Sequence, residues 1–449
     1  MSTYRLNKYL VIKDLGAGCK CIFNSFNFET VKITDAAYTK LTEKIKEGSI
    51  DWHKDADKVL LDKKILVDND FDEERMVEYK FLKVNHSDEV LELLIMPTLK
   101  CNFRCLYCYE KHEDTDMTEE VQNAVITFVR KKMKEYGSLH VSWFGGEPLL
   151  RMDIIEKLSE AFIQVCKENK KTYFADMTTN GYLLSYEKLK MLKRLKVISF
   201  QITVDGTREF HDKQRVLAGG AETFERIISN LNEIKEKDRS KFLFFQIRMN
   251  LTKLNLINKA EFQTFFSETF GDDPRFMKIE TCAWPGNDEN KDNYLIEEEK
   301  LLYFSGPTVK LLENIRDDEE EIARFKVERV RKIMVPCKCA RGNHFGIDPN
   351  GKIFMCEAHI DDERVKVGIL DKSGNMKFDE CAYSKWITKK YNKKCLECEI
   401  QPICLSSSCP YKIGILNSDK LCEEMKVSVD YVISKISANM YLCPEIFEV

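Results

Sequence analysis

The central part of the chain, from about residue 89 to 285, alternates strand-like apolar runs with helical patterns, and this alternation limits the possible folds most strongly. Six strands are predicted, at 90–96, 139–144, 173–178, 197–204, 242–250 and 275–281. Helical patterns lie between them at 118–136, 153–167, 186–195, 223–236 and 258–270. Repeated strand–helix units with right-handed crossovers give a parallel sheet. Six units rather than eight predict an α/β partial barrel, open on one side, with its sites at the carboxyl ends of the strands.

Polar and glycine-rich motifs follow the first four predicted strands. In chain order they are the triplet Cys101, Cys105 and Cys108, then Gly145-Gly-Glu-Pro148, Thr179-Asn-Gly181 and Asp205-Gly206. Because the carboxyl ends of parallel strands meet at one edge, we expect all four motifs on the same rim of the barrel.

Three thiolates within eight residues cannot fill four tetrahedral positions. A cubane iron–sulfur cluster held by Cys101, Cys105 and Cys108 would keep one iron free of protein, and a small molecule can bind there. Unrelated buried thiols or an incomplete zinc site are the alternatives, and the tight spacing disfavours both.

The spacing C-x3-C-x2-C, with the aromatic Tyr107 just before the last cysteine, resembles the signature of the radical S-adenosylmethionine (radical SAM) enzymes. In that family the amino and carboxylate groups of SAM complete the fourth iron. An electron passes from the cluster to the sulfonium, and the resulting 5′-deoxyadenosyl radical removes hydrogen from an unactivated carbon. The run Gly145, Gly146, Glu147 and Pro148 resembles the family's GGEP motif, which binds the methionine amino group of SAM.

The same resemblance implies further SAM contacts. Tyr107 occupies the aromatic place beside the adenine, Thr203 matches a hydroxyl position near the SAM carboxylate, and Arg215 matches a basic position of peptide-maturing members. The family usually has Ser where Thr203 stands. Asn180, Arg248 and Asn250 are candidates for ribose contacts. Structural roles are the alternatives, with Asp205-Gly206 as a turn and Arg215 as a surface ion-pair residue.

Composition excludes several classes of function. The net charge of −4 gives no basic field for nucleic acid. No signal peptide and no run of about 18 apolar residues occurs, so we expect no membrane span and a cytoplasmic location. Cytoplasmic thiols stay reduced. Metal or cluster ligation therefore explains why ten of the 17 cysteines lie between residues 337 and 443.

The spacing of these cysteines resembles the SPASM domain, which binds two auxiliary [4Fe-4S] clusters in radical SAM enzymes. By that resemblance one cluster is held by Cys337, Cys339, Cys356 and Cys409. The other is held by Cys395, Cys398, Cys404 and Cys422. With the SAM-binding cluster, this makes three [4Fe-4S] clusters.

Two departures from the SPASM pattern concern the first auxiliary cluster. Four residues rather than three separate Cys404 from Cys409, and a single residue separates Cys337 from Cys339. Either departure would leave that cluster with an open iron. A zinc ribbon is the rival for Cys395 and Cys398.

The opening residues, 1–87, predict small strands at 9–14, 21–28 and 30–34, followed by a helix at 36–46 that Thr34 or Asp35 caps and Gly48 ends. This pattern resembles the winged-helix peptide-recognition element in front of peptide-modifying radical SAM enzymes. There an exposed strand edge takes up a leader peptide as an added strand. A purely structural cap is the alternative.

The whole chain thus predicts four parts: a winged-helix-like recognition domain (1–87), a TIM-like (β/α)6 partial barrel (88–285), a charged helical linker (286–336) and a cysteine-rich SPASM domain (337–449). This combination resembles maturases of ribosomally made peptides, and we favour thioether formation from a Cys sulfur. The expected partners are a precursor peptide with a leader and an electron donor such as flavodoxin or ferredoxin. Carbon–carbon cross-linking, formylglycine formation in a sulfatase and a plain iron–sulfur electron carrier are the alternatives.

Overall fold

The structure is a computed structural model that describes residues 4–51, 53–283, 294–296, 337–388, 393–404, 410–411, 426, 429–430 and 433. The chain divides into two compact units. One comprises Met1–His86, Gly306–Arg341 and Ile387–Val449, and the other comprises Ser87–Ser305 and Gly342–Trp386. Apart from 294–296, the predicted linker lies outside the described residues.

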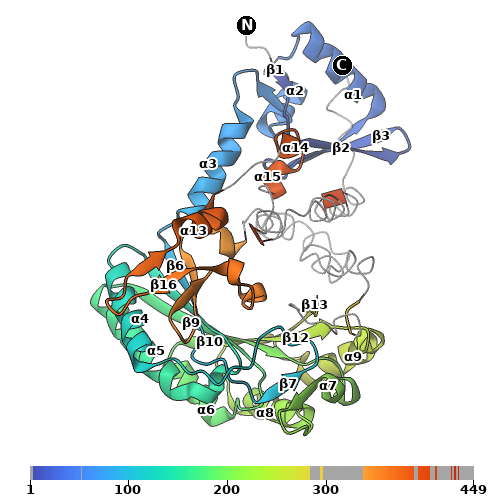
Figure 1. Cartoon of the computed structure of the whole chain (residues 1–449). Helices are drawn as coiled ribbons and strands as arrows, with labels where there is room; N and C mark the ends of the chain where they lie inside the picture. Colours follow the sequence, from blue (N-terminus) through green and yellow to red (C-terminus); the bar gives the residue numbers. More distant parts are fainter. Residues whose placement is uncertain are drawn as a thin grey trace. The chain divides into compact units, whose positions relative to one another are not determined.

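A curved parallel sheet forms the centre of the second unit (Figure 1). Its strands lie in the order β13-β12-β10-β9-β8-β6, with parallel pairing throughout. Their bounds are β6 (Val90–Ile95), β8 (Ser138–Trp143), β9 (Thr172–Thr179), β10 (Val197–Thr203), β12 (Phe244–Leu251) and β13 (Phe276–Cys282). The predicted partial barrel is therefore confirmed, and each predicted strand begins and ends within two residues of the observed one.

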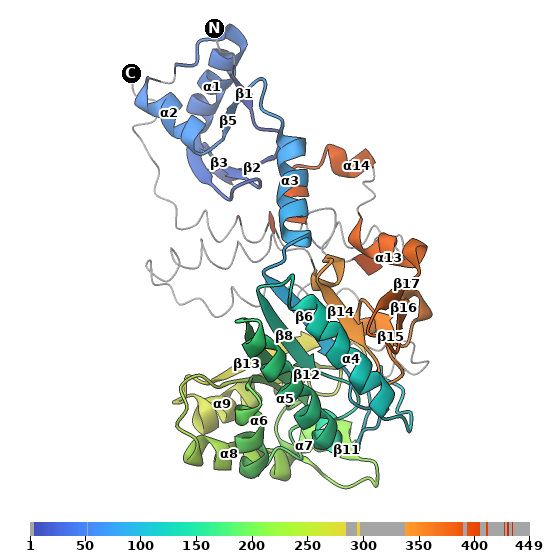
Figure 2. The ribbon, with the colours of Figure 1, turned by 90° about the vertical axis from the view of Figure 1, so that its left-hand side faces the viewer.

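Helices cover the outer face of this sheet (Figures 1 and 2). They are α4 (Glu119–Lys132), α5 (Met152–Glu168), α6 (Tyr186–Arg194), α8 (Phe224–Lys237) and α9 (Lys259–Phe270). The hydroxyls of Thr118 and Ser185 cap α4 and α6 by accepting backbone N–H groups of the first turn. On the outer face of β9, the Tyr173 hydroxyl donates to Ser159 Oγ of α5 at 3.2 Å. The apolar stripes of the helices thus pack on one face of the sheet only.

Four strands from the cysteine-rich range extend the same sheet. β14 (His344–Ile347) pairs parallel with β6, and β15 (Lys352–Phe354), β16 (Lys366–Leu370) and β17 (Met376–Phe378) follow antiparallel. Figure 2 shows β14 beside β6. β6 therefore has hydrogen-bonded neighbours on both sides.

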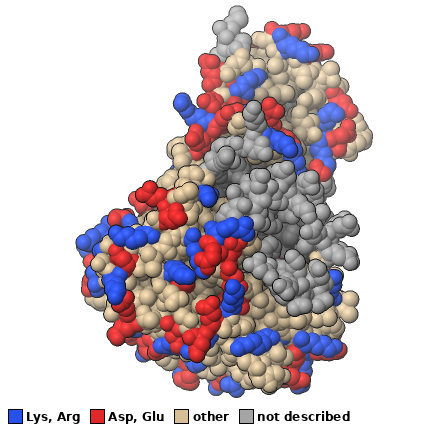
Figure 3. Space-filling view, in the orientation of Figure 1, with Lys and Arg blue, Asp and Glu red and all other residues tan. Residues whose placement is uncertain are grey.

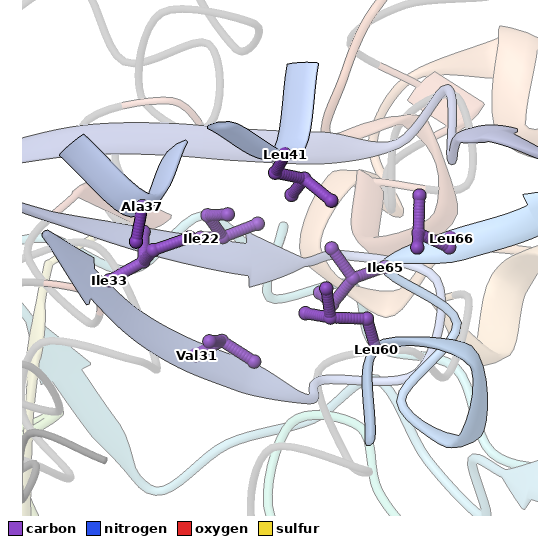
Figure 4. Close-up of a cluster of buried hydrophobic side chains, with 8 residues drawn as sticks. All are labelled: Ile22, Val31, Ile33, Ala37, Leu41, Leu60, Ile65 and Leu66. Atoms are coloured by element: carbon purple, nitrogen blue, oxygen red, sulfur yellow. The ribbon is translucent and has the colours of Figure 1, made fainter. Parts of the chain in front are cut away.

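The first unit contains a three-stranded antiparallel sheet of β2 (Leu10–Gly16), β3 (Cys19–Asn24) and β4 (Thr30–Thr34), in which β2 is an edge strand. It also contains α1 (Asp35–Glu47), α2 (Asp55–Asp62), α3 (Glu73–Asn85) and the strand pair β1 (Tyr4–Leu6) and β5 (Leu66–Asp68). Thr34 caps α1 and Gly48 ends it with φ 66°, as predicted. Figure 4 shows the apolar core between β3, β4, α1, α2 and β5, made by Ile22, Val31, Ile33, Ala37, Leu41, Leu60, Ile65 and Leu66.

A second core joins the N-terminal sheet to residues from the end of the chain. Cys21 and Phe23 of β3 pack with Ile400, Ile403, Val429 and Ile433. The Ser25 hydroxyl donates to the Glu399 carbonyl at 2.5 Å, close to α14 (Lys393–Leu396) and α15 (Gln401–Cys404). The predicted recognition domain and these C-terminal residues therefore share one hydrophobic interior.

Charges of both signs are interspersed on the face drawn in Figure 3. Among the described residues, the helices are all too short or too polar to span a bilayer.

Two adjacent glycines follow β8 and lie against the segment that leads to Cys101. A Cβ at Gly146 would lie 2.1 Å from the Lys100 carbonyl oxygen. Gly145 has φ +96°, and a Cβ there would lie 2.6 Å from the Thr98 carbonyl oxygen. Both clashes are with backbone, so only glycine allows this close approach.

We predict that Gly146→Ala lowers the free energy of unfolding by about 2–3 kcal/mol, because the 98–100 backbone must move. The melting temperature should fall by roughly 5 °C or more. Gly219→Ala is the matched control, since a Cβ there meets no atom within 4 Å. Equal melting temperatures for the two variants, measured by circular dichroism, would show that the glycine pair does not pack against this segment.

Candidate active site

The cysteine triplet lies in a loop that is fixed by a short strand pair. β7 (Phe103–Cys105) pairs antiparallel with β11 (Arg215–Leu217), which places Arg215 directly opposite Cys105. Backbone N–H groups of Leu106 and Ala218 extend this pairing at 2.9 and 2.8 Å. The loop is therefore held in place by the chain segment that contains the predicted basic residue.

The three cysteines are half-buried, and their thiols influence one another electrostatically. Burial raises the pKa of the Cys101 thiol to about 12, and the Glu147 carboxylate adds to the effect. Burial also raises the pKa of Cys105, against the opposing charge of Arg215. The pKa of Cys108 lies well above its usual value because of burial and the nearby Glu110. Three half-buried thiols on one short loop fit a metal cluster, since bound iron replaces their protons.

Glu147 connects several segments at the rim of the barrel by hydrogen bonds. Its fully buried carboxylate accepts hydrogen bonds from the Thr179 hydroxyl at 2.8 Å, the Asn180 N–H at 2.8 Å and the Leu149 N–H at 3.0 Å. Its own N–H donates to the Lys100 carbonyl at 2.8 Å. Burial raises the pKa of Glu147, and these hydrogen bonds oppose the shift. The predicted GGEP motif thus joins β8, β9 and the cysteine loop.

A buried network surrounds the hydroxyl of Tyr107. That hydroxyl contacts the Asp205 carboxylate and accepts from Arg215 Nη1 at 2.9 Å and Asn250 Nδ2 at 3.0 Å. Asp205 is fully buried and also accepts the Asn250 N–H at 2.7 Å. Burial raises the pKa of Asp205, and Arg215 opposes that shift. The Arg215 guanidinium also lies over the Phe103 ring, 5.5 Å from its centroid.

The remaining predicted SAM contacts lie at or beside the carboxyl ends of the strands. Asn180 Nδ2 donates to the Asn102 side chain, next to Cys101, at 2.8 Å. Thr203 is buried at the end of β10. Arg248 Nε donates to Asn250 Oδ1 at 2.9 Å and Thr281 Oγ1 at 3.0 Å. The structure brings the four predicted motifs together on one rim; a contact of each residue with SAM stays a prediction.

The loop beyond Cys108 adds two groups for which the sequence analysis named no role. His112 Nε2 lies 3.5 Å from Cys108 Sγ. Glu110 has its pKa raised to about 8 by burial and by Asp361 and Glu147, and among the described residues its Oε2 has no hydrogen-bond partner. Beside Glu110 lies a cavity of about 170 Å³ that is also lined by Met96, Leu99, Asp348, Phe354 and Asp361.

The predicted auxiliary ligands are described only in part. Cys337 is half-buried, Cys339 and Cys356 are buried, and Cys395 and Cys398 lie one turn apart, with the Cys398 N–H donating to the Cys395 carbonyl at 3.3 Å. Burial raises the pKa of the Cys398 thiol, and the nearby Glu399 and Cys395 add to it. Cys404 ends α15, while Cys409 and Cys422 lie outside the described residues. The two auxiliary ligand sets therefore remain predictions.

The inner face of the barrel carries polar residues that the sequence analysis missed. His140 of β8 and Asp176 of β9 lie within hydrogen-bonding distance, with Nε2 and Oδ2 2.6 Å apart. The alternation of polar and apolar residues along both strands was the available signal. A central strand covered on both faces would have been apolar throughout.

Comparisons with known proteins agree with this geometry. Residues 95–256 match the radical SAM superfamily. The cysteine-type anaerobic sulfatase-maturating enzyme of Clostridium novyi (strain NT) is 23% identical over 374 residues, which cover 77% of this chain and 96% of that protein. The GTP 3′,8-cyclase of Campylobacter jejuni (strain RM1221) is 32% identical over 176 residues, which cover 38% of this chain and 49% of that protein.

Among solved structures, native anSMEcpe with bound AdoMet and Cp18Cys peptide resembles this chain with a TM-score of 0.59 at 19% identity. The match covers 78% of this chain and all of that one. This likeness supports the fold, and the superfamily match implies SAM and one [4Fe-4S] cluster. Residues 95–256 of this chain therefore match the radical SAM superfamily, and the cysteine loop and the Gly145–Glu147 motif lie within that match.

Proposed function

We propose that the protein modifies a ribosomally made precursor peptide and forms a thioether between a Cys sulfur and a carbon of another residue. The observation that carries the proposal is the three-cysteine loop, tied through Glu147, Asn180 and Arg215 to the rim of a partial barrel. The sulfatase-maturating relative is matched over nearly its whole length, and the anSMEcpe structure contains a bound peptide. Both support a peptide substrate.

Cys101, Cys105 and Cys108 would hold the cluster, and Glu147, Asn180, Thr203, Arg215 and Tyr107 would surround SAM. When bound, these groups supply a 5′-deoxyadenosyl radical. The chain's own residues then have to fix the geometry of the loop and exclude water. The buried contacts of Tyr107 with Arg215 and Asn250 fix the loop geometry, because they restrict this part of the loop to a single conformation.

We predict that Cys105→Ala removes about four of roughly twelve iron atoms per chain, because one of three [4Fe-4S] clusters loses a ligand. Formation of 5′-deoxyadenosine from SAM under reducing conditions should also stop. Cys166→Ala is the matched control, since Cys166 is a buried thiol in α5 outside every predicted ligand set. Iron analysis and chromatography measure both quantities. An unchanged iron content in Cys105→Ala would contradict the assignment.

The N-terminal sheet supports recognition of a leader peptide. β2 is an edge strand, so its outer side can accept a further strand through main-chain hydrogen bonds. Ile12, near the middle of β2, is 40% exposed. An added peptide strand would cover it.

We predict that Ile12→Lys weakens binding of a leader-containing peptide at least about tenfold, which corresponds to about 1.4 kcal/mol. Leu82→Lys is the control, because Leu82 has a similar exposure of 44% but lies on α3. Fluorescence anisotropy with a labelled peptide encoded beside this chain's gene measures the affinity. Equal affinities of the two variants would count against the strand edge as the binding site. Point variants are preferable to deletion of residues 1–87, which would expose Ile400 and Ile403.

The cysteine-rich end supplies the reason for favouring a thioether. One residue separates Cys337 from Cys339, and this spacing makes it difficult for both side chains to reach the same cluster. One iron of the first auxiliary cluster would then have an open coordination position, which would suit a substrate thiolate. Formylglycine formation is the second candidate, because the Clostridium novyi relative is a cysteine-type sulfatase-maturating enzyme.

Mass spectrometry of the product separates the two candidates. For a thioether we predict loss of two hydrogen atoms from the peptide and disappearance of one thiol that can be alkylated. Formylglycine would instead give an aldehyde that reacts with hydrazides. A product that retains every thiol would exclude both candidates and favour a carbon–carbon cross-link.

A further inference from the structure

The two faces of the barrel sheet differ sharply in character. Side chains that point toward the helices are apolar and almost fully buried: Val141, Ala175, Met177, Phe200 and Phe245 are at most 1% exposed. On the same central strands, most of the alternate residues are polar and only partly buried. The polar residues are Ser142, Asp176, Thr178, Gln201 and Gln246, and the partly buried Phe174 and Phe244 are apolar exceptions on this face.

The polar side chains of this face are not tightly packed against one another. In a closed eight-stranded barrel, layers of bulky apolar residues pack the centre. Here the side chains of His140 and Asp176 retain 25% and 32% of their accessible surface, although both lie on central strands. Their face therefore borders open space. Its hydroxyl and amide groups suit the backbone amides of a peptide.

Within this face, His140 is held in one orientation. Its Nε2 lies 2.6 Å from Asp176 Oδ2, and the Ser142 hydroxyl donates to the same oxygen at 3.0 Å. The imidazole stacks on Phe174 with ring centroids 4.7 Å apart. A carboxylate that accepts the Nε2 proton leaves the lone pair on Nδ1, and it stabilises the imidazolium after proton uptake.

The other charged groups on this face lie on the neighbouring strands. Glu92 of β6 is the backbone partner of His140, and His344 of β14 lies 3.5 Å from Glu92. Arg248 lies on β12, opposite Thr203 at the end of β10. His140 thus has carboxylates on both adjacent strands, whereas the guanidinium is three strands away.

The position of His140 along its strand connects it with the reaction. β8 ends at Trp143, and the Gly145–Glu147 motif follows. His140 is three residues from that end, about 10 Å below the rim. A peptide that reaches the rim from inside the barrel would pass it.

We propose that His140, oriented by Asp176, accepts the proton of the substrate cysteine thiol. The inference rests on the proposed function, since it assumes a Cys-containing peptide. The S–H bond breaks, its electron pair stays on sulfur, and a new N–H bond forms at Nδ1. No electron is gained or lost in this step. Thioether formation and formylglycine formation would both require it.

The test compares His140→Gln and Asp176→Asn with the full-length, cluster-loaded wild-type enzyme, using the Cys-containing peptide encoded beside its gene. We predict that His140→Gln lowers the rate of product formation at least about a hundredfold. Iron content, 5′-deoxyadenosine formation and peptide affinity should stay within about twofold. Asp176→Asn should show a smaller loss of this rate.

Added imidazole should restore part of the rate in His140→Gly, because the space left by the side chain can admit the free base.

Controls distinguish the possible failures. His86→Gln, at the end of α3, should match the wild type. Wild-type-like turnover by His140→Gln would overturn the inference, and so would a loss confined to peptide affinity or the absence of imidazole rescue. If the wild type itself leaves the peptide unmodified, the proposed function fails instead. If His140→Gln loses iron, its low rate no longer reports on proton transfer. The rate and pH profile of Asp176→Asn then test the inference.

Discussion

The arrangement of the candidate active site depends on one buried carboxylate. Asp205 follows β10, is inaccessible to solvent, and is contacted by groups from three other segments: Tyr107 of the cysteine loop, Arg215 of β11 and Asn250 of β12. A buried charge without partners is strongly destabilising, and removal of one partner of a buried ion pair typically costs about 3–5 kcal/mol. The Asp205 contacts therefore exclude other positions of this part of the loop.

Glu147 has the corresponding role on the opposite side of the loop. It joins β8, β9 and the loop backbone through hydrogen bonds to Thr179, Asn180 and Lys100. Two buried acidic residues, at the ends of strands that are not adjacent in the sheet, thus hold the cysteines between them. The glycines before Glu147 bring this motif against the chain's own backbone, and this close approach is the role that the structure shows for them.

The sequence predicted the barrel strands well because their buried face is apolar and their ends carry glycine or polar motifs. It did not indicate β7 and β11, which are three residues long and are defined by tertiary contact rather than by periodicity. The cysteine triplet and the GGEP motif were recognisable from spacing alone. The His140–Asp176 pair was not, because its two members lie 36 residues apart and only strand register brings them together. The addition of β14–β17 to the barrel sheet likewise depends on pairing between distant segments.

That added sheet segment has a consequence for how the protein unfolds. Without β14, β6 would be an exposed edge, and the strand that leads into the cysteine loop would fray at low free-energy cost. With hydrogen-bonded neighbours on both sides, β6 can open only when residues from two distant parts of the chain separate together. Residues 342–386 therefore stabilise the barrel strand that leads into the cysteine loop, and the two should form a single cooperative unit in amide hydrogen exchange.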